Sequence, residues 1–335
     1  MTANAATRLL QHYVDNFRRL PWRSAPGAAP PDPYRVWLSE VMLQQTTVAA
    51  VMPRFEQFVE RWPTFEALAA ASDEEILSEW AGLGYYARAR NLITCAREVA
   101  RRGAFPTTAE ELRELPGIGD YTSAAIAAIA FGEGAAAVDT NVARVIARLN
   151  GLERPARAEV EVLVRAMLPP ARAGDFTQAM MDLGATICRP KVPLCGQCPL
   201  SVDCAAYASS TPAAFPAAKA KRVRPLKHGI AWWIEQDGHV WLVRRPAKGM
   251  LGGMAALPGS DWTEAPLKPD PQRLGAVRHV FTHFALELEV VRRFDPMGEG
   301  WWQPLDRLAE AGLPTLYRRV ANTVLSAKET ARAAA

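Results

Sequence analysis

Four of the five cysteines lie within one short segment of the chain, with six, two and five residues between successive members. They are Cys188, Cys195, Cys198 and Cys204. A chain of 335 residues does not need disulfide bonds to stabilise its core, so this cluster indicates a metal site. Zinc sites usually use two closely spaced cysteine pairs, whereas only the middle pair is close here. The spacing favours a 4Fe–4S cluster and leaves a zinc ion as the alternative.

A second segment with chemical potential is LPGIGDYTSAAI, residues 115–126, which lies between helical stretches. Gly117 and Gly119 permit a backbone conformation closed to other residues and a close approach to a partner. The helix that follows, which contains Thr122, offers unpaired N–H groups to an anion such as a DNA phosphate. The alternative is an ordinary turn between two helices, because glycine pairs are common in turns.

The bulk composition places few limits on function. The 39 basic and 35 acidic residues give a net charge of +4, which permits nucleic-acid binding without requiring it. The N-terminal segment lacks the apolar stretch of a signal peptide, and no run of eighteen apolar residues occurs. We therefore expect a cytoplasmic protein in a reducing compartment, with no membrane association.

Residues 34–205 are rich in Ala and Leu at helical spacing, so this region should be almost entirely helical. Residues 206–228 have the composition of a linker, with a basic run of Lys219, Lys221, Arg222, Arg224 and Lys227. Beyond it, GIAWWIEQDGHVWLVRRP predicts two strands joined by a tight turn at Asp237-Gly238. The sequence therefore predicts a multidomain protein, mostly α at the N-terminus, with a separate α+β domain at residues 229–335.

Three motifs together resemble the helix-hairpin-helix DNA glycosylases that carry an iron–sulfur cluster: LPGIG, VDTNVARV and the four-cysteine spacing. The resemblance covers residues 8–205. Four further segments are similar to the MutY-type adenine DNA glycosylases, namely LPWR (20–23), VWLSEVMLQQT (36–46), GLGYYARARN (82–91) and QAMMDLGA (178–185). The C-terminal third resembles a Nudix domain more loosely, through WLVRRP, GMLGGMAALPG and VRHVFTH.

The resemblance implies an architecture and an activity. Residues 1–29 and 134–205 would form a cluster-bearing helical domain, and residues 30–133 a six-helix domain with the hairpin. The activity would be hydrolysis of the N-glycosidic bond of adenine mispaired with 8-oxoguanine or guanine in double-stranded DNA, in base excision repair. The enzyme would act as a monomer associated with the nucleoid. The C-terminal domain would help to recognise 8-oxoguanine. It lacks the acidic REXXEE core of a Nudix box, so we do not expect pyrophosphate hydrolysis.

The same resemblance assigns the catalytic groups. Glu40 would protonate adenine, and Asp139 would stabilise the positive charge that develops on the sugar. The apolar helical neighbours of Glu40 should raise its pKa, although a solvated glutamate is the ordinary alternative. Asp139 precedes NVARVIARL as a helix N-cap would, and this is compatible with catalysis. Asn141 would orient Asp139 or a water molecule, and Tyr121 occupies the position of the Schiff-base lysine of bifunctional relatives, which predicts a monofunctional enzyme.

The remaining carried-over residues would contact the substrate. Trp22, Arg23, Leu43 and Gln178 would line the adenine pocket. Gln45 and Tyr85 would enter the duplex, Arg88 would bind a phosphate, and Phe281, Thr282 and His283 would meet 8-oxoguanine. Two rival functions remain open at this point: a bifunctional glycosylase for pyrimidine lesions, and a noncatalytic DNA-binding redox sensor.

Overall fold

The computed structural model describes residues 2–218, 223–246 and 249–333. The chain divides into two compact units, one of residues 1–73 and 88–220 and one of residues 74–87 and 221–335. This places the end of the first unit inside the predicted linker. Lys219, Lys221 and Arg222 of the basic run lie outside the described residues. The predicted division of the helical region into two domains stays a prediction.

The first unit is helical, as predicted. Its helices are α1 (Thr2–Asp15), α2 (Pro33–Leu43), α3 (Val48–Arg61), α4 (Phe65–Ala70), α6 (Ala87–Arg102), α7 (Ala109–Leu112), α8 (Asp120–Phe131), α9 (Thr140–Asn150), α10 (Arg157–Met167), α11 (Ala173–Asp182) and α12 (Ala205–Ala208). Helix α5 (Asp73–Glu79) begins at the boundary of the segment grouped with the second unit.

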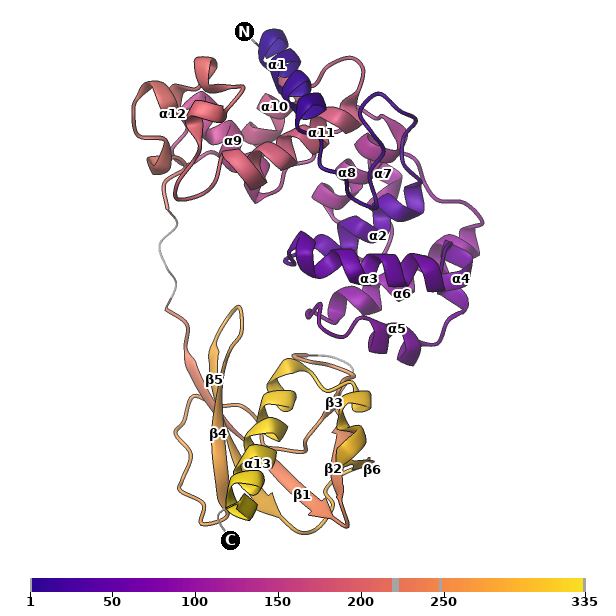
Figure 1. Ribbon diagram of the computed structural model, residues 1–335, viewed down its shortest axis with the longest axis vertical. Coiled ribbons are helices and arrows are strands. Elements are labelled where there is room, and N and C mark those ends of the chain that lie inside the picture. Colours follow the sequence, from indigo (N-terminus) through magenta and orange to yellow (C-terminus); the bar gives the residue numbers. More distant parts are fainter. Residues whose placement is uncertain (1, 219–222, 247–248, 334–335) are drawn as a thin grey trace. The chain divides into compact units, whose positions relative to one another are not determined.

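Helix α8 is the central element of the first unit, and α2 and α11 pack against it (Figure 1). Every residue from 122 to 130 of α8 is buried, and most of these residues are alanine or isoleucine. Gly174 at the start of α11 has so close a neighbour that an added Cβ would lie 2.8 Å from the Ala128 carbonyl oxygen. Small residues therefore let α11 approach α8 closely, and this packing brings α2, α8 and α11 to one pocket.

A second core of the same unit joins α1, α9, α10 and α11 to the cysteine-bearing segment. Helix α11 continues into a π-helical turn, Leu183–Ile187, which leads to Cys188. Two short 3₁₀ turns follow, Cys195–Gln197 and Ser201–Asp203. Arg8 of α1 binds the Asp203 carboxylate and donates from Nε to the Pro199 carbonyl at 3.2 Å, so the first helix holds this loop in place.

The beginning of the predicted linker is ordered structure attached to the first unit. Residues 205–208 form α12, and Pro212–Ala214 form a 3₁₀ turn. The Phe215 carbonyl then accepts from Arg148 Nε at 2.9 Å, and the Ala217 N–H donates to the Glu153 carbonyl at 2.7 Å. Composition alone indicated a linker from residue 206, because the backbone hydrogen bonds that anchor these residues come from distant α9 and its following loop.

The C-terminal part is an α+β domain, as predicted. Its strands are β1 (Leu226–Gln236), β2 (His239–Arg244), β3 (Ala255–Ala256), β4 (Arg273–Val280), β5 (Ala285–Arg293) and β6 (Gly300–Pro304). The order is β3-β2-β1-β5-β4, β6 also pairs with β2, and β1 and β5 are parallel. A 3₁₀ segment, Leu305–Ala311, precedes α13 (Thr315–Ala333), which packs on the sheet (Figure 1).

The predicted turn at Asp237-Gly238 is confirmed. Gln236 pairs with His239, and the two residues between them have φ values of 46° and 73°. Positive φ at both central positions is the conformation that a two-residue hairpin requires. Among the residues described, no helix combines the length and the apolar character needed to cross a membrane.

Gly117 offers a test of the hairpin's packing. Its φ is 79°, and an added Cβ would lie 2.6 Å from Asn91 Cβ, so we expect Gly117→Ala to lower the free energy of unfolding by about 1–3 kcal/mol. Gly119 is the matched control, because its Cβ would meet nothing within 4 Å and its φ is −97°. Urea unfolding of the two variants measures the difference, and equal stabilities would contradict this account.

Candidate active site

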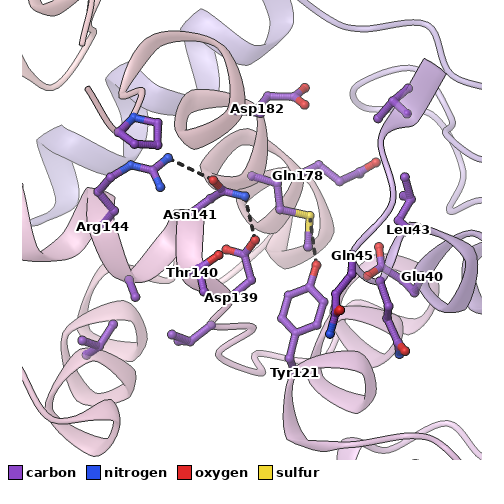
Figure 2. Close-up of a pocket in the computed structure, with 18 of the residues that line it drawn as sticks. Glu40, Leu43, Gln45, Tyr121, Asp139, Thr140, Asn141, Arg144, Gln178 and Asp182 are labelled. Atoms are coloured by element: carbon purple, nitrogen blue, oxygen red, sulfur yellow. Dashed lines mark hydrogen bonds between the residues drawn. The ribbon is translucent and has the colours of Figure 1, made fainter. Parts of the chain in front are cut away.

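One large pocket lies in the first unit, with a volume of about 1680 Å³. Four elements supply its central side chains (Figure 2): α2 provides Glu40, α8 provides Tyr121, the start of α9 provides Asp139, and α11 provides Gln178. Sequence reasoning named all four, although they are up to 138 positions apart in the chain, from 40 to 178. The structure brings them together in this pocket.

Glu40 is almost fully buried, with 6% of its surface exposed. Burial raises the pKa of its carboxyl group to about 7, and the Asp139 carboxylate contributes to the rise. The Tyr121 hydroxyl and the Arg23 guanidinium oppose this shift without cancelling it. The predicted rise in the pKa of Glu40 is confirmed, and near neutral pH a large fraction of this group carries a proton.

Tyr121 lies in the first turn of α8 and is partly buried at the pocket wall. Burial, followed by the negative charges of Glu40 and Asp139, raises the pKa of its phenol well above the usual value. Its hydroxyl contacts Met181 Sδ at 3.8 Å (Figure 2). Tyr121 therefore stays neutral between the two acidic groups and can donate a hydrogen bond.

Asp139 caps helix α9, as the sequence predicted. Its Oδ1 accepts a hydrogen bond from the Val142 N–H at 2.7 Å, and its Oδ2 accepts from Asn141 Nδ2 at 2.9 Å. The cap and the amide fix both carboxylate oxygens at the pocket wall (Figure 2).

Asn141 is itself held by Arg144, whose Nη2 donates to Asn141 Oδ1 at 2.9 Å (Figure 2). The same guanidinium donates to the Gly184 carbonyl at 2.7 Å and to the Cys188 carbonyl at 2.8 Å. An added Cβ at Gly184 would lie 2.7 Å from Asn141 Cβ, so the two residues are in tight contact. This network links Asp139 to the first cysteine. Sequence reasoning missed Arg144, although it follows Asn141 by one helical turn.

The residues predicted to bind adenine line the same pocket. Trp22 is buried and packs edge-on against Phe55, with ring centroids 5.0 Å apart. Arg23 forms a two-pronged ion pair with Asp182, at 2.6 and 3.0 Å, and Arg18 binds the same carboxylate at 2.9 Å. Sequence reasoning missed Arg18 and Asp182. The available signal was the spacing of Gln178 and Asp182, since residues four apart share a helix face.

Two predicted DNA contacts do not fit their positions. Thr122 is 3% exposed, and its hydroxyl accepts from Gln44 Nε2 at 3.3 Å, so its side chain faces the domain interior. Arg88 is 9% exposed and binds the end of α2 instead of reaching the surface. The predicted contact of Arg88 with a phosphate stays a prediction, and the binding of its guanidinium to internal acceptors argues against it.

Gly117 and Gly119 fulfil different structural needs. Gly117 packs against Asn91, whereas Gly119 is the N-cap of α8 and no side chain caps that helix. The space around Gly119 is open, and the first N–H groups of α8 follow it. This turn is suited to receiving an anion through backbone donors.

Gln45 and Tyr85 are both exposed and both have positive φ, at 57° and 47°. Left-handed backbone in residues other than glycine costs roughly 1–2 kcal/mol and is concentrated at functional sites. Gln45 lies on the pocket lining beside Leu43 (Figure 2). Their predicted insertion into a duplex stays a prediction, and this local strain supports it.

The four clustered cysteines are partly buried free thiols. Burial raises the pKa of Cys198 to about 11, and the charges of Cys188, Cys204 and Cys195 contribute to that rise. Arg148 contacts the first and the last of the four, because its Nη1 donates to Cys188 Sγ at 3.4 Å and its carbonyl accepts from Cys204 Sγ at 3.3 Å. Across residues 2–218, 223–246 and 249–333, no three His, Cys, Asp or Glu side chains form a group that would hold a single metal ion.

Phe281, Thr282 and His283 form the turn between β4 and β5. Phe281 stacks on Trp262 with ring centroids 5.5 Å apart, and its N–H donates to the Phe284 carbonyl at 2.8 Å. Thr282 and His283 are exposed at the tip. The stacked rings of Phe281 and Trp262 thus support a turn that exposes the Thr282 hydroxyl and the His283 imidazole to solvent.

Comparison with known proteins identifies two family models in the chain. Residues 38–170 match the HhH-GPD superfamily of base excision DNA repair proteins, and residues 229–323 match the NUDIX domain. The first match contains Glu40, Tyr121 and Asp139.

Curated relatives match over most of the chain. Human adenine DNA glycosylase is 36% identical over 84% of this chain, and the mouse protein is 35% identical over 85%. The chain spans 65% of the human protein and 69% of the mouse protein. A solved structure of a trapped endonuclease III–DNA covalent intermediate is 26% identical, covers 62% of this chain and 95% of that chain, and superimposes with a TM-score of 0.52.

The raised pKa of Glu40 makes a prediction about stability. The folded protein holds this proton up to about pH 7, whereas the unfolded chain loses it near pH 4.5, so wild-type stability should fall as the pH rises between these values. Glu40→Gln removes that loss. We expect the free energy of unfolding of the variant, relative to that of wild type, to rise by up to about 3 kcal/mol between pH 5 and pH 8, as measured by urea unfolding. Glu60→Gln, at an exposed site, is the control, and a gap independent of pH would contradict burial of the carboxyl.

Proposed function

Because this chain belongs to the adenine DNA glycosylase family, we propose that it hydrolyses the N-glycosidic bond of adenine mispaired with 8-oxoguanine or guanine in double-stranded DNA. Membership of the family places the chain among base excision repair glycosylases. The choice of adenine, and of its mispairs, is supported by the names of the relatives and by the pocket residues. We propose that the protein acts as a monomer at chromosomal DNA.

One observation supports this proposal above the others: Glu40 and Asp139 line the same pocket, but the surroundings of the two carboxyl groups differ. Cleavage of an N-glycosidic bond requires a proton on the departing base and stabilisation of a positively charged sugar. Buried Glu40, with its pKa of about 7, supplies the proton to the adenine ring. Asp139, held by the helix cap and Asn141, faces the developing cation with its carboxylate. A water molecule completes the hydrolysis.

Other pocket residues position the base. Trp22 offers a rigid aromatic wall. Gln178 offers an amide from the middle of α11, and its Nε2 donates to the Gly174 carbonyl at 3.3 Å, which leaves the amide oxygen as an acceptor. Both Nη atoms of Arg23 bind the Asp182 carboxylate, so Asp182 balances the positive charge of Arg23 near Glu40. The pocket is thus suited to a neutral purine.

We propose that the enzyme leaves the DNA strand intact. Strand cleavage through a Schiff base requires an amine nucleophile, and the hairpin position that bears a lysine in bifunctional relatives carries Tyr121 here. The raised pKa of its phenol keeps it neutral, so it is a poor nucleophile. This argument disfavours the bifunctional alternative, whereas the pairing of Glu40 with Asp139 disfavours a noncatalytic redox sensor.

We propose that Cys188, Cys195, Cys198 and Cys204 hold a 4Fe–4S cluster. Four thiolates around zinc at about 2.3 Å would lie within about 4 Å of one another, and the described residues contain no such group. Arg148 contacts both Cys188 Sγ and Cys204 Sγ, so the two ends of the segment approach one residue, and the six-two-five spacing of the cysteines suits a larger cluster. When bound, the cluster would stabilise the loop. Arg144 and Arg148 bind the backbone of this loop at Cys188, Arg189 and Pro190.

Base release by active-site variants tests the proposed function. We expect wild type to release adenine from duplexes with an adenine–8-oxoguanine pair and to leave the strand intact until alkali is added. Glu40→Gln and Asp139→Asn should each slow release by at least about 100-fold. The wild-type rate should fall about tenfold for each pH unit above 7, since the acid is then deprotonated. Full activity in either variant would refute the mechanism.

The turn at residues 281–283 provides a test of lesion recognition. Thr282→Val keeps the shape of the side chain and removes the hydroxyl, so we expect the preference for 8-oxoguanine over guanine to fall by about 3–10-fold. Thr282→Ser, which keeps the hydroxyl, should retain the preference. The measurement compares single-turnover rates on duplexes that differ only in the base opposite adenine, and an unchanged ratio in Thr282→Val would exclude this contact.

A further inference from the structure

Arg88 occupies the first turn of α6 and is one of the few buried charged residues of the described chain. Its Nη1 donates to the carbonyl oxygens of Val41 at 3.0 Å and Met42 at 2.7 Å, and its Nη2 donates to Thr46 Oγ1 at 2.8 Å. The three acceptors lie within six residues of one another. Arg88 therefore binds one short segment of the chain, residues 41–46, immediately after Glu40.

That stretch is the C-terminal end of α2. The last carbonyl groups of a helix have no partners within the helix, and they carry partial negative charge. A guanidinium group presents several donors in a rigid plane, so one arginine can satisfy two adjacent carbonyls and neutralise this end of the helix dipole. Arg88 thereby fixes the turn of α2 that bears Glu40.

Thr46 extends the contacts of Arg88 to the residue that follows Gln45. The Thr46 hydroxyl accepts from Arg88 and contacts the Gln44 carbonyl at 3.3 Å. The residues on both sides of Gln45 are consequently held through Arg88. Gln45 has a φ of 57°, a conformation that persists only where surrounding contacts enforce it. Its side chain lies at the pocket beside Glu40 (Figure 2).

We propose that Arg88 is a positioning residue that sets the Gln44–Thr46 turn, so that Gln45 contacts the DNA held at the catalytic pocket. This inference rests on the proposed function, because it assigns a role to a turn beside the adenine site. Arg88 acts through Thr46 and the backbone of α2, and it touches neither the base nor the sugar.

Substitutions at Thr46 and Gln45 test the inference while the Arg88 guanidinium keeps its hydrogen bonds to the Val41 and Met42 carbonyl oxygens. Thr46→Val removes the hydroxyl and keeps the shape, whereas Thr46→Ser keeps the hydroxyl. In single-turnover adenine release we expect Thr46→Val to be slower than wild type by about 3–10-fold and Thr46→Ser to recover most of that loss. Arg88→Lys should be slower by about 10–100-fold, because one ammonium group cannot span the three acceptors.

A double-mutant cycle with Gln45→Ala separates positioning from general stability. If Arg88 acts through Gln45, Thr46→Val should change the rate by less than about twofold in the Gln45→Ala background. Arg97→Gln is the control, since Arg97 is an exposed residue of the same helix that pairs with Asp73. Urea unfolding of each variant establishes the folded fraction used to scale the rates.

The possible outcomes distinguish this inference from the proposed function. Absence of adenine release by wild type would overturn the proposed function. Normal release by wild type together with an unimpaired Thr46→Val variant, or with independent effects of Thr46→Val and Gln45→Ala, would overturn only the role of Arg88. A loss in Thr46→Val that disappears without the Gln45 side chain, at unchanged folded fraction, supports it.

Discussion

The exclusion of water from one carboxyl group is the constraint on which the site depends. Glu40 retains its proton near neutral pH because α2 and α11 pack against the small, buried residues of α8. Gly174 permits this close approach, and Tyr121 at the start of α8 supplies a neutral neighbour. The helical packing and the acid–base property are therefore one feature. A looser contact between the helices would admit water and return Glu40 to an ordinary acidity.

The second half of the site depends on directed hydrogen bonds instead of desolvation. Asp139 is held by its helix cap and by Asn141, which Arg144 anchors to carbonyl groups at Gly184 and Cys188. The orientation of this carboxylate therefore depends on the backbone that begins the cysteine-bearing loop. The surroundings of the two acidic groups therefore differ: Glu40 is buried away from water, whereas Asp139 is held by hydrogen bonds to polar groups.

Local sequence patterns predicted the features that neighbouring residues determine. The apolar neighbours of Glu40 indicated its raised pKa, VDTN indicated the cap at Asp139, and Asp237-Gly238 indicated the hairpin. Long polar side chains were harder, because an arginine on a helix can turn inward or outward and its partner lies elsewhere in the chain. Arg88 shows this, since its acceptors on α2 precede it by more than 40 positions. Asp182 was missed because its two arginine partners precede it by more than 150 positions.

Under the proposed function, the burial of Glu40 also couples its proton to the binding of DNA. A duplex that covers the pocket removes further water and brings negative phosphates near, and both changes favour the neutral form of the acid. By thermodynamic reciprocity, the protonated enzyme must then hold the duplex more tightly than the ionised one. The hydrogen ion would in this sense be a co-ligand of DNA, taken up as the complex forms, passed to the departing base and replaced by the proton that the attacking water releases.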